Sequence, residues 1–198
     1  MTQLIFWALV CSLLLSNGLL VVSIVRPELR FWPPPEVSSR RYRFSRAIGF
    51  LAPLTILGVA ALAPLDSGSG LFGHPSRFVL GSLFFSAGGG FALWGYLGLG
   101  VGASQGQHEG LVAAGAYRYS RNPQYVGTIV CLLGYAVFFN SALELVVWAL
   151  WSAWFLAAPF AEEPWLREQV GSSYDEYAKE VPRYFRWVGH STTTTGSS

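Results

Sequence analysis

FVLGSLFFSAGGGFALWGYLGLGV, residues 78–101, decides the class of this protein. The stretch contains no charged side chain, and a helix needs only about 20 largely apolar residues to cross the core of a lipid bilayer. The whole chain is 52% apolar and only 12% charged, whereas soluble domains carry about 25% charged residues. The sequence therefore predicts an all-α integral membrane protein with about five transmembrane helices. Four further stretches, the third of them short, have the same character: residues 4–25, 47–65, 125–139 and 143–161.

The positive charges give this predicted bundle an orientation. Arg77 stands on one side of the predicted membrane, and the other twelve of the 13 basic residues stand on the opposite side. Since basic residues concentrate in cytoplasmic loops, we expect the N-terminus outside and the C-terminus and polar loops in the cytoplasm. The net charge of +2 is then an orientation signal, and no interleaving of basic and aromatic residues indicates nucleic-acid binding. The twelve are Arg26, Arg30, Arg40, Arg41, Arg43, Arg46, Arg118, Arg121, Arg167, Lys179, Arg183 and Arg186.

Outside the apolar stretches the chain is typical of one membrane domain over residues 1–190. The first stretch has no basic segment before it and no small-residue cleavage site after it, so we expect a retained anchor rather than a signal peptide. Trp32 precedes three prolines, which predicts an elbow at the interface. Asn140-Ser141 allows only a tight hairpin between the last two stretches. Residues 191–198 form a polar tail that we expect to be disordered.

After residue 161 the pattern becomes amphipathic. Apolar and aromatic side chains recur at helical spacing among charges, with a break at Gly171 and an end before Pro182. We expect helical pieces that lie against the membrane surface or fold back over a site. The recurring side chains are Trp165, Leu166, Val170, Tyr174, Tyr177 and Val181.

Three other patterns carry no separate function. Cys11 and Cys131 lie inside predicted spans and the histidines are scattered, whereas a metal site needs clustered ligands. Residues 98–102 look like part of a nucleotide-binding loop, but they end an apolar helix rather than following a strand. A group of glycines is explained better as small residues that let membrane helices approach closely: Gly81, Gly88, Gly89, Gly90 and Gly95.

Most of the hydrogen-bonding chemistry lies in two places, the polar island at residues 108–125 and the carboxylate pair Glu162-Glu163. Arg121 can bind a carboxylate with two parallel hydrogen bonds, Pro123 stiffens the turn, and the tyrosines offer rings and hydroxyls. Together these groups could cradle a small zwitterion. The alternative is structural: the island anchors helix ends at the lipid interface, and Glu162-Glu163-Pro164 begins a solvated helix.

The two places also carry a family resemblance, which covers residues 108–185. The chain resembles the integral-membrane methyltransferases typified by isoprenylcysteine carboxyl methyltransferase and related to the phosphatidylethanolamine N-methyltransferases. The two motifs agree with that family in order, in spacing and in position relative to the spans, whereas the first three stretches match only in being hydrophobic. The motifs are Leu111-Val112-x-x-Gly115-x-Tyr117-x-x-x-Arg121-Asn122-Pro123-x-Tyr125-x-Gly127 and Glu162-Glu163-x-x-Leu166, followed by Gly171-x-x-Tyr174-x-x-Tyr177 and Val181-Pro182-Arg183-Tyr184-Phe185.

The resemblance implies a helical membrane enzyme whose cytoplasmic segments wrap S-adenosylmethionine, closed by C-terminal helical segments and open sideways to a lipophilic or lipid acceptor. It implies that Arg121 and Glu163 are the catalytic residues, with Arg121 and Glu162 positioning the cofactor and Glu163 facing the acceptor. A carboxylate, a guanidinium and aromatic faces are complementary to the ammonium, carboxylate and sulfonium of this cofactor, and methyl transfer from it needs no metal. The implied cofactor contacts are His108, Leu111, Val112, Tyr117, Asn122, Pro123, Tyr125 and Glu162.

The chain departs from the family pattern at three places. Asn122 stands where the family has histidine, and asparagine cannot titrate near neutral pH. One extra residue lies between His108 and Leu111, and Ala158 stands where the carboxyl methyltransferases hold the substrate carboxylate with arginine. Two other functions stay open: a nicotinamide-dependent membrane reductase of the sterol-reductase type, and a non-enzymatic membrane partner protein. The nucleophilic atom of the acceptor and the oligomeric state also stay open.

Overall fold

The computed structural model describes residues 1–34, 42–43, 51–70, 73–99 and 112–185. Every regular element within these residues is helical. In chain order the elements are α1 (Thr2–Val25), η1 (Pro27–Leu29), α3 (Leu51–Leu65), α4 (Ser76–Leu99), η2 (Gly115–Arg118), α6 (Pro123–Phe139), α7 (Ala142–Val170) and α8 (Ser172–Glu180). The predicted all-α membrane protein is therefore confirmed.

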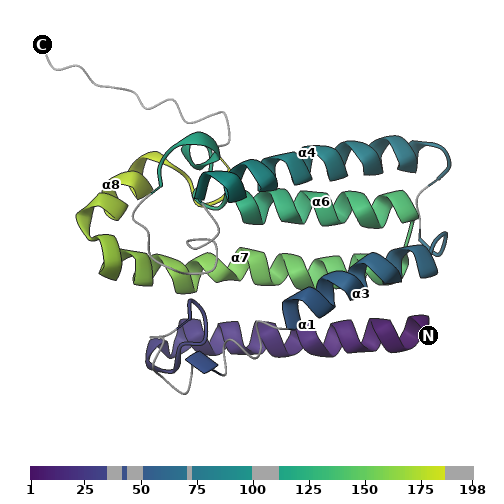
Figure 1. Ribbon diagram of the computed structural model, residues 1–198, viewed down its shortest axis with the longest axis horizontal. Coiled ribbons are helices and arrows are strands. Elements are labelled where there is room, and N and C mark those ends of the chain that lie inside the picture. Colours follow the sequence, from purple (N-terminus) through teal and green to yellow (C-terminus); the bar gives the residue numbers. More distant parts are fainter. Residues whose placement is uncertain (35–41, 44–50, 71–72, 100–111, 186–198) are drawn as a thin grey trace, which may run out of the picture.

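The long helices run along one axis and form two pairs. Figure 1 shows α4 beside α6 and α1 beside α7, with α3 crossing between α1 and α7 near the N-terminal end of α1. Three helices, α1, α4 and α7, are long and apolar enough to cross a membrane, and α3 and α6 supply two shorter apolar helices. Each of the five predicted stretches therefore contains a helix in its described part.

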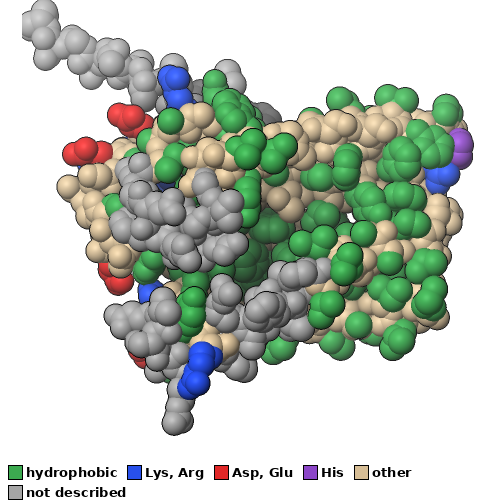
Figure 2. Space-filling model, viewed as in Figure 1, with side chains coloured by type: hydrophobic (Ala, Val, Ile, Leu, Met, Phe, Trp, Pro, Cys, Tyr) green, Lys and Arg blue, Asp and Glu red, His purple; other side chains and the backbone are tan. Residues whose placement is uncertain are grey.

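The surface of this bundle is apolar, as expected where side chains face lipid. Leu4 of α1, Leu57 of α3 and Leu97 of α4 are 75%, 66% and 72% exposed. A soluble monomer rarely exposes contiguous apolar patches of this extent, and Figure 2 shows hydrophobic side chains spread over the helical face. Charged side chains gather instead at the end of the molecule that holds α8.

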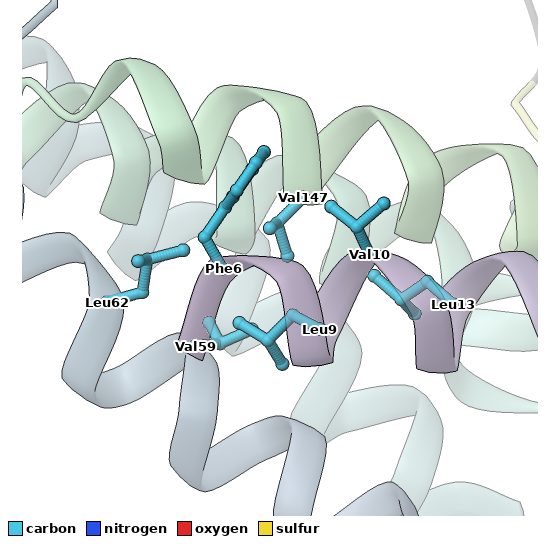
Figure 3. Close-up of a cluster of buried hydrophobic side chains, with 7 residues drawn as sticks. All are labelled: Phe6, Leu9, Val10, Leu13, Val59, Leu62 and Val147. Carbon is cyan, nitrogen blue, oxygen red and sulfur yellow. The ribbon is translucent and has the colours of Figure 1, made fainter. Parts of the chain in front are cut away.

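The core that joins three of the helices is small and apolar. Side chains from one face of α1 meet α3 and Val147 of α7, as Figure 3 shows. Val147 and Leu62 are fully buried there. This contact fixes α1 alongside α7, so that the end of α1 comes to lie beside the last turns of α7. The cluster consists of Phe6, Leu9, Val10, Leu13, Val59, Leu62 and Val147.

Glycines bring α4 and α6 into backbone contact. Gly81, Gly88 and Gly95 follow one another at seven-residue intervals, and all three are buried against α6. A Cβ atom at Gly81 would lie 2.7 Å from Cα of Phe138. Gly90 has no atom within 4 Å of such a Cβ position. The packing role predicted for the glycines is thus confirmed for the three at this interface.

The hairpin between α6 and α7 is as tight as predicted. Asn140 takes the left-handed conformation (φ 54°) that ends α6, and the Ser141 side chain accepts a hydrogen bond from the Glu144 amide at the start of α7. Asp66, just after α3, accepts hydrogen bonds from the Ser141 hydroxyl at 2.8 Å and the Leu143 amide at 3.0 Å. This carboxylate therefore ties the end of α3 to the hairpin.

The last apolar stretch continues further than the sequence predicted. We expected this stretch to end at residue 161, and the structural alternative began a new helix at Glu162-Glu163-Pro164, but α7 passes through Pro159 and Pro164 without a break to Val170. Membrane helices tolerate proline because neighbouring groups satisfy the freed carbonyls. The solvated helix start proposed as an alternative for Glu162-Glu163 is therefore wrong. The predicted break at Gly171 is confirmed, because Gly171 ends α7 at φ 62° and α8 follows.

We expect Asp66→Asn to destabilise the protein at neutral pH by about 1 kcal/mol, because an ionised carboxylate is a stronger hydrogen-bond acceptor than a neutral amide. Burial raises the pKa of Asp66, but hydrogen bonds from Ser69, the Leu143 amide and Ser141 outweigh it and lower the pKa overall. A carboxyl group whose pKa is lower in the folded state stabilises that state at any pH above its pKa in the unfolded chain. This stabilisation is lost as the pH falls through the pKa of the group in the folded state. The melting temperatures of wild type and variant, measured in detergent from about pH 7 down to about pH 3, across the range in which carboxyl groups titrate, should therefore converge at the acid end. Glu176→Gln, at an exposed position of α8, is the control, and parallel curves for Asp66→Asn and wild type at every pH would contradict the prediction.

Candidate functional site

The polar groups meet at the end of the bundle where α1, α4 and α7 finish and α8 folds back (Figure 1). Three parts of the chain build the site: the corner at residues 119–123 before α6, the last turns of α7, and the segment at residues 181–185 after α8. These parts are distant along the chain, and hydrogen bonds join them.

The corner before α6 is clamped by backbone groups of the C-terminal segment. Asn122 precedes the helix, and Pro123 fills its first turn, where a missing amide donor costs nothing. The Arg121 amide donates to the Pro182 carbonyl at 2.9 Å, and the Asn122 side chain donates to the Arg183 carbonyl at 2.8 Å. The Arg121-Asn122-Pro123 motif therefore begins α6 and also binds the C-terminal segment.

Glu163 is the hub of the charged cluster. Arg183 binds it with two parallel hydrogen bonds, from Nε to Oε1 at 2.6 Å and from Nη2 to Oε2 at 2.8 Å. Arg121 Nη1 lies 3.1 Å from the same Oε1. The Glu163 side chain is only 5% exposed, so two guanidinium groups compensate one buried carboxylate. Glu163 thereby ties the corner and the C-terminal segment to α7.

Glu162, the next residue along the chain, has different surroundings. Its Oε1 accepts a hydrogen bond from the Tyr125 hydroxyl and one from Nε1 of Trp32 at 2.5 Å. Trp32 also packs on Trp154, with ring centroids 5.6 Å apart. Neither donor carries a formal charge, and no arginine or lysine within the described residues forms an ion pair with Glu162. Glu162 is therefore a partly buried carboxylate among aromatic rings without a cationic partner in this part of the chain.

Buried tyrosines join α8 to the polar island. Tyr174 and Tyr177 of α8 pack with Tyr117 of η2, and Val112 packs against the same cluster. The Tyr177 hydroxyl donates to the Tyr117 carbonyl at 2.7 Å, and Arg121 Nη1 donates to the Tyr174 hydroxyl at 3.2 Å. Burial raises the pKa of Tyr117 and of Tyr177, so both hydroxyls stay protonated at neutral pH. The amphipathic residues after α7 thus fold back over the polar groups, one of the two arrangements that the sequence predicted.

The structure brings most of the predicted site residues together. Arg121 pairs with Glu163 rather than with Glu162, and Tyr125 pairs with Glu162. Pro123 is fully buried at the start of α6. His108 and Leu111 lie outside the described residues. The predicted residues with contacts at this end of the bundle are Val112, Tyr117, Arg121, Asn122, Pro123, Tyr125, Glu162 and Glu163.

Sequence reasoning missed two residues of the site. Arg183 lay in one of the quoted motifs, but nothing in its spacing indicated that it pairs with Glu163. Trp32 was assigned only to an elbow, whereas its indole reaches Glu162, 130 positions away. The prolines after Trp32 predict a turn, but they do not predict which residue the Trp32 side chain contacts.

Comparisons with known proteins place this site in a family context. Residues 76–173 match the family model described as phospholipid methyltransferase. Two curated proteins of Arabidopsis thaliana are similar to the chain: protein-S-isoprenylcysteine O-methyltransferase A, 34% identical over 77 residues, and protein-S-isoprenylcysteine O-methyltransferase B, 31% identical over 78 residues. Each match covers 38% of this chain and 39% of the relative, so the chain spans about two fifths of the length of the curated relatives that it matches. No solved structure matches the chain.

Proposed function

Since the chain belongs to the superfamily of integral-membrane methyltransferases, we propose that it transfers a methyl group from S-adenosylmethionine to a lipophilic or lipid acceptor within the membrane. The observation that carries this proposal is the unequal environment of the two adjacent acids. Glu163 is neutralised by two arginines, whereas Glu162 has only neutral donors among the described residues. A partly buried carboxylate is stable when it is paired, and a positively charged ligand supplies the missing charge.

The residues around Glu162 fit such a ligand. When bound, S-adenosylmethionine supplies a methyl group on a positively charged sulfur, and transfer of that methyl to an acceptor lone pair leaves a neutral thioether. The Glu162 carboxylate attracts the cationic groups, and the rings of Tyr125, Trp32 and Trp154 offer negative faces beside it. Tyr117 and Val112 pack against the tyrosines of α8. No metal is needed for this chemistry.

The protein's own task is positioning rather than proton transfer. Methyl transfer requires that donor and acceptor atoms lie in line, about 3 to 3.5 Å apart and shielded from water. Glu163, Arg121 and Arg183 fix the corner and the C-terminal segment around that place. Asn122 uses its side-chain amide to hold the Arg183 carbonyl, which is a structural task that asparagine performs without titrating. The two candidate catalytic residues, Arg121 and Glu163, therefore act together by holding the corner and the C-terminal segment in place.

The packing around Ala158 supports an acceptor other than the carboxylate of a prenylcysteine. Ala158, where the carboxyl methyltransferases carry arginine, is fully buried with Leu20 and Ala161 in an apolar cluster. A carboxylate acceptor would lack its cationic partner at this position. The charge distribution supports a site on the cytoplasmic side, where a soluble donor would reach it, and the apolar surface of the bundle supports an acceptor that enters from the lipid. The family match favours methyl transfer over a nicotinamide-dependent reductase and over a non-enzymatic membrane partner.

We expect Glu162→Gln to weaken binding of S-adenosylhomocysteine by about 10- to 100-fold, the effect of losing a charge-assisted bond of roughly 1.5 to 3 kcal/mol. Isothermal titration calorimetry on purified protein in detergent measures this directly. Transfer of radiolabelled methyl from S-adenosylmethionine into a total membrane-lipid extract tests the activity and reveals the class of acceptor.

The control is Glu168→Gln, at an exposed position of the same helix. It should bind S-adenosylhomocysteine as the wild type does. Unchanged affinity of Glu162→Gln removes Glu162 from the site. Wild-type protein that binds a reduced nicotinamide nucleotide and not S-adenosylhomocysteine overturns the proposed function itself.

A further inference from the structure

The segment after α1 returns to the bundle and reaches the site from outside the family-matched residues. The Ser23 hydroxyl, in the last turns of α1, accepts hydrogen bonds from the amides of Phe31 and Trp32 at 2.9 and 3.2 Å. The same hydroxyl donates to the Leu19 carbonyl at 2.9 Å, and Ser23 is buried. Pro33, the next residue after Trp32, is fully buried. The segment is therefore folded back against α1 and held there.

This anchoring directs the Trp32 side chain toward α7. Its ring lies in the apolar cluster formed by Leu20 of α1 and Ala158 and Ala161 of α7. Its Nε1 reaches Oε1 of Glu162 at 2.5 Å. The Tyr125 hydroxyl, from α6, donates to the same oxygen. Two donors on one oxygen restrict the rotation of the Glu162 carboxylate.

We propose that Trp32 is a positioning residue of the donor site, which orients the Glu162 carboxylate through its indole N–H. The inference rests on the proposed function, because Glu162 is the residue proposed to bind the cationic groups of the donor. It adds that the first transmembrane helix and the segment after it are part of the site, although the family match begins only at residue 76. The packing of α1 against α7 then serves the chemistry as well as the fold.

The variant Trp32→Phe tests this, because it keeps an aromatic ring and removes only the N–H donor. Because Trp32→Phe removes one hydrogen bond to a charged group, we expect the affinity for S-adenosylhomocysteine to fall by about 10-fold and the melting temperature to fall by a few degrees, whereas a purely structural role would lower the melting temperature alone. In the Glu162→Gln background the same substitution should have little further effect, because a positioning residue acts only through the group that it positions.

A matched control is present on α7. Trp148 Nε1 donates to the Ile129 carbonyl at 2.9 Å, and Glu162 follows Trp148 by 14 positions, which places Trp148 about 21 Å along the helix from the site. Trp148→Phe removes the same kind of donor and should leave the affinity for S-adenosylhomocysteine unchanged.

The indole itself gives a readout that does not depend on a ligand. In protein labelled with 5-fluorotryptophan, the ¹⁹F resonance that disappears in Trp32→Phe should shift in Glu162→Gln without any ligand added. Wild-type affinity in Trp32→Phe, or an equal loss in both backgrounds, overturns the inference while the proposed function stands. Wild-type protein that fails to bind S-adenosylhomocysteine overturns both, and the resonance then reports only whether the contact exists.

Discussion

Replacing Glu163 with glutamine is expected to release the C-terminal segment from the bundle and to lower the stability of the protein. Glutamine keeps the shape of the side chain but removes the charge that two guanidinium groups share, at 2.6 and 3.1 Å. Breaking a buried ion pair from one side costs about 3 to 5 kcal/mol, because the partner charges stay behind uncompensated. Since Arg183 is 30% exposed and water compensates it in part, we expect about 3 kcal/mol, or a fall of roughly 6 to 12 °C in melting temperature.

Two measurements follow this release. Thermal melts in detergent give the loss of stability. Limited trypsin digestion reports the segment itself, because trypsin cuts after arginine and the Arg183 side chain and carbonyl are both engaged in the wild type. Cleavage after Arg183 should be faster in Glu163→Gln than in the wild type.

The matched control is the ion pair between Arg167 of α7 and Asp175 of α8. Its atoms are also close, at 2.9 Å, but the side chains are 46% and 54% exposed. Exposed pairs contribute about 0 to 1 kcal/mol, so Asp175→Asn should shift the melting temperature by only a few degrees, on the order of 2 to 4 °C at most. Equal shifts in the two variants would show that Glu163 is not a buried hub.

The sequence predicts the helical class and the two polar motifs well, for a physical reason. Lipid imposes length and apolarity on each spanning helix, and both can be read along the chain. A helix can also continue beyond the apolar region, and then its end is set by contacts rather than by hydropathy. This explains why the sequence placed the end of α7 at residue 161, whereas packing of its last turns against α8 and the C-terminal segment carries the helix to Val170.

The different partners of Glu162 and Glu163 lay beyond sequence reasoning. Consecutive residues of a helix point about 100° apart, so neighbours in sequence face different parts of the fold. Which face meets Arg183 and which meets Trp32 depends on how α1, α6 and the C-terminal segment pack around α7. Residue types and spacing show that a carboxylate pair is present, but only the packing assigns a partner to each carboxylate.

The second large effect is expected from Gly88→Ala, at the contact between α4 and α6. A Cβ atom at Gly88 would overlap the Cys131 amide nitrogen and lie 2.7 Å from the Gly127 carbonyl oxygen. Both are backbone atoms of α6, so no side-chain rotation can relieve the overlap, and the helices must separate. Overpacking costs about 1 to 3 kcal/mol, and we expect the upper end, or roughly 6 to 12 °C in melting temperature.

Gly90→Ala makes the same chemical change two residues away, where no atom lies within 4 Å of the added Cβ. Alanine favours a helix over glycine by about 1 kcal/mol, so this control should be as stable as the wild type or slightly more stable.

The separation of α4 and α6 in Gly88→Ala should also reach the site, because Gly95 lies on the same face of α4, where a Cβ would approach Pro123 to 2.9 Å. Pro123 begins α6 directly after the Arg121-Asn122 corner, so moving α6 away from α4 displaces the residues that hold the C-terminal segment. We therefore expect Gly88→Ala to weaken S-adenosylhomocysteine binding as well as stability, whereas a variant that loses stability but binds normally would show that the corner is held by the C-terminal segment alone.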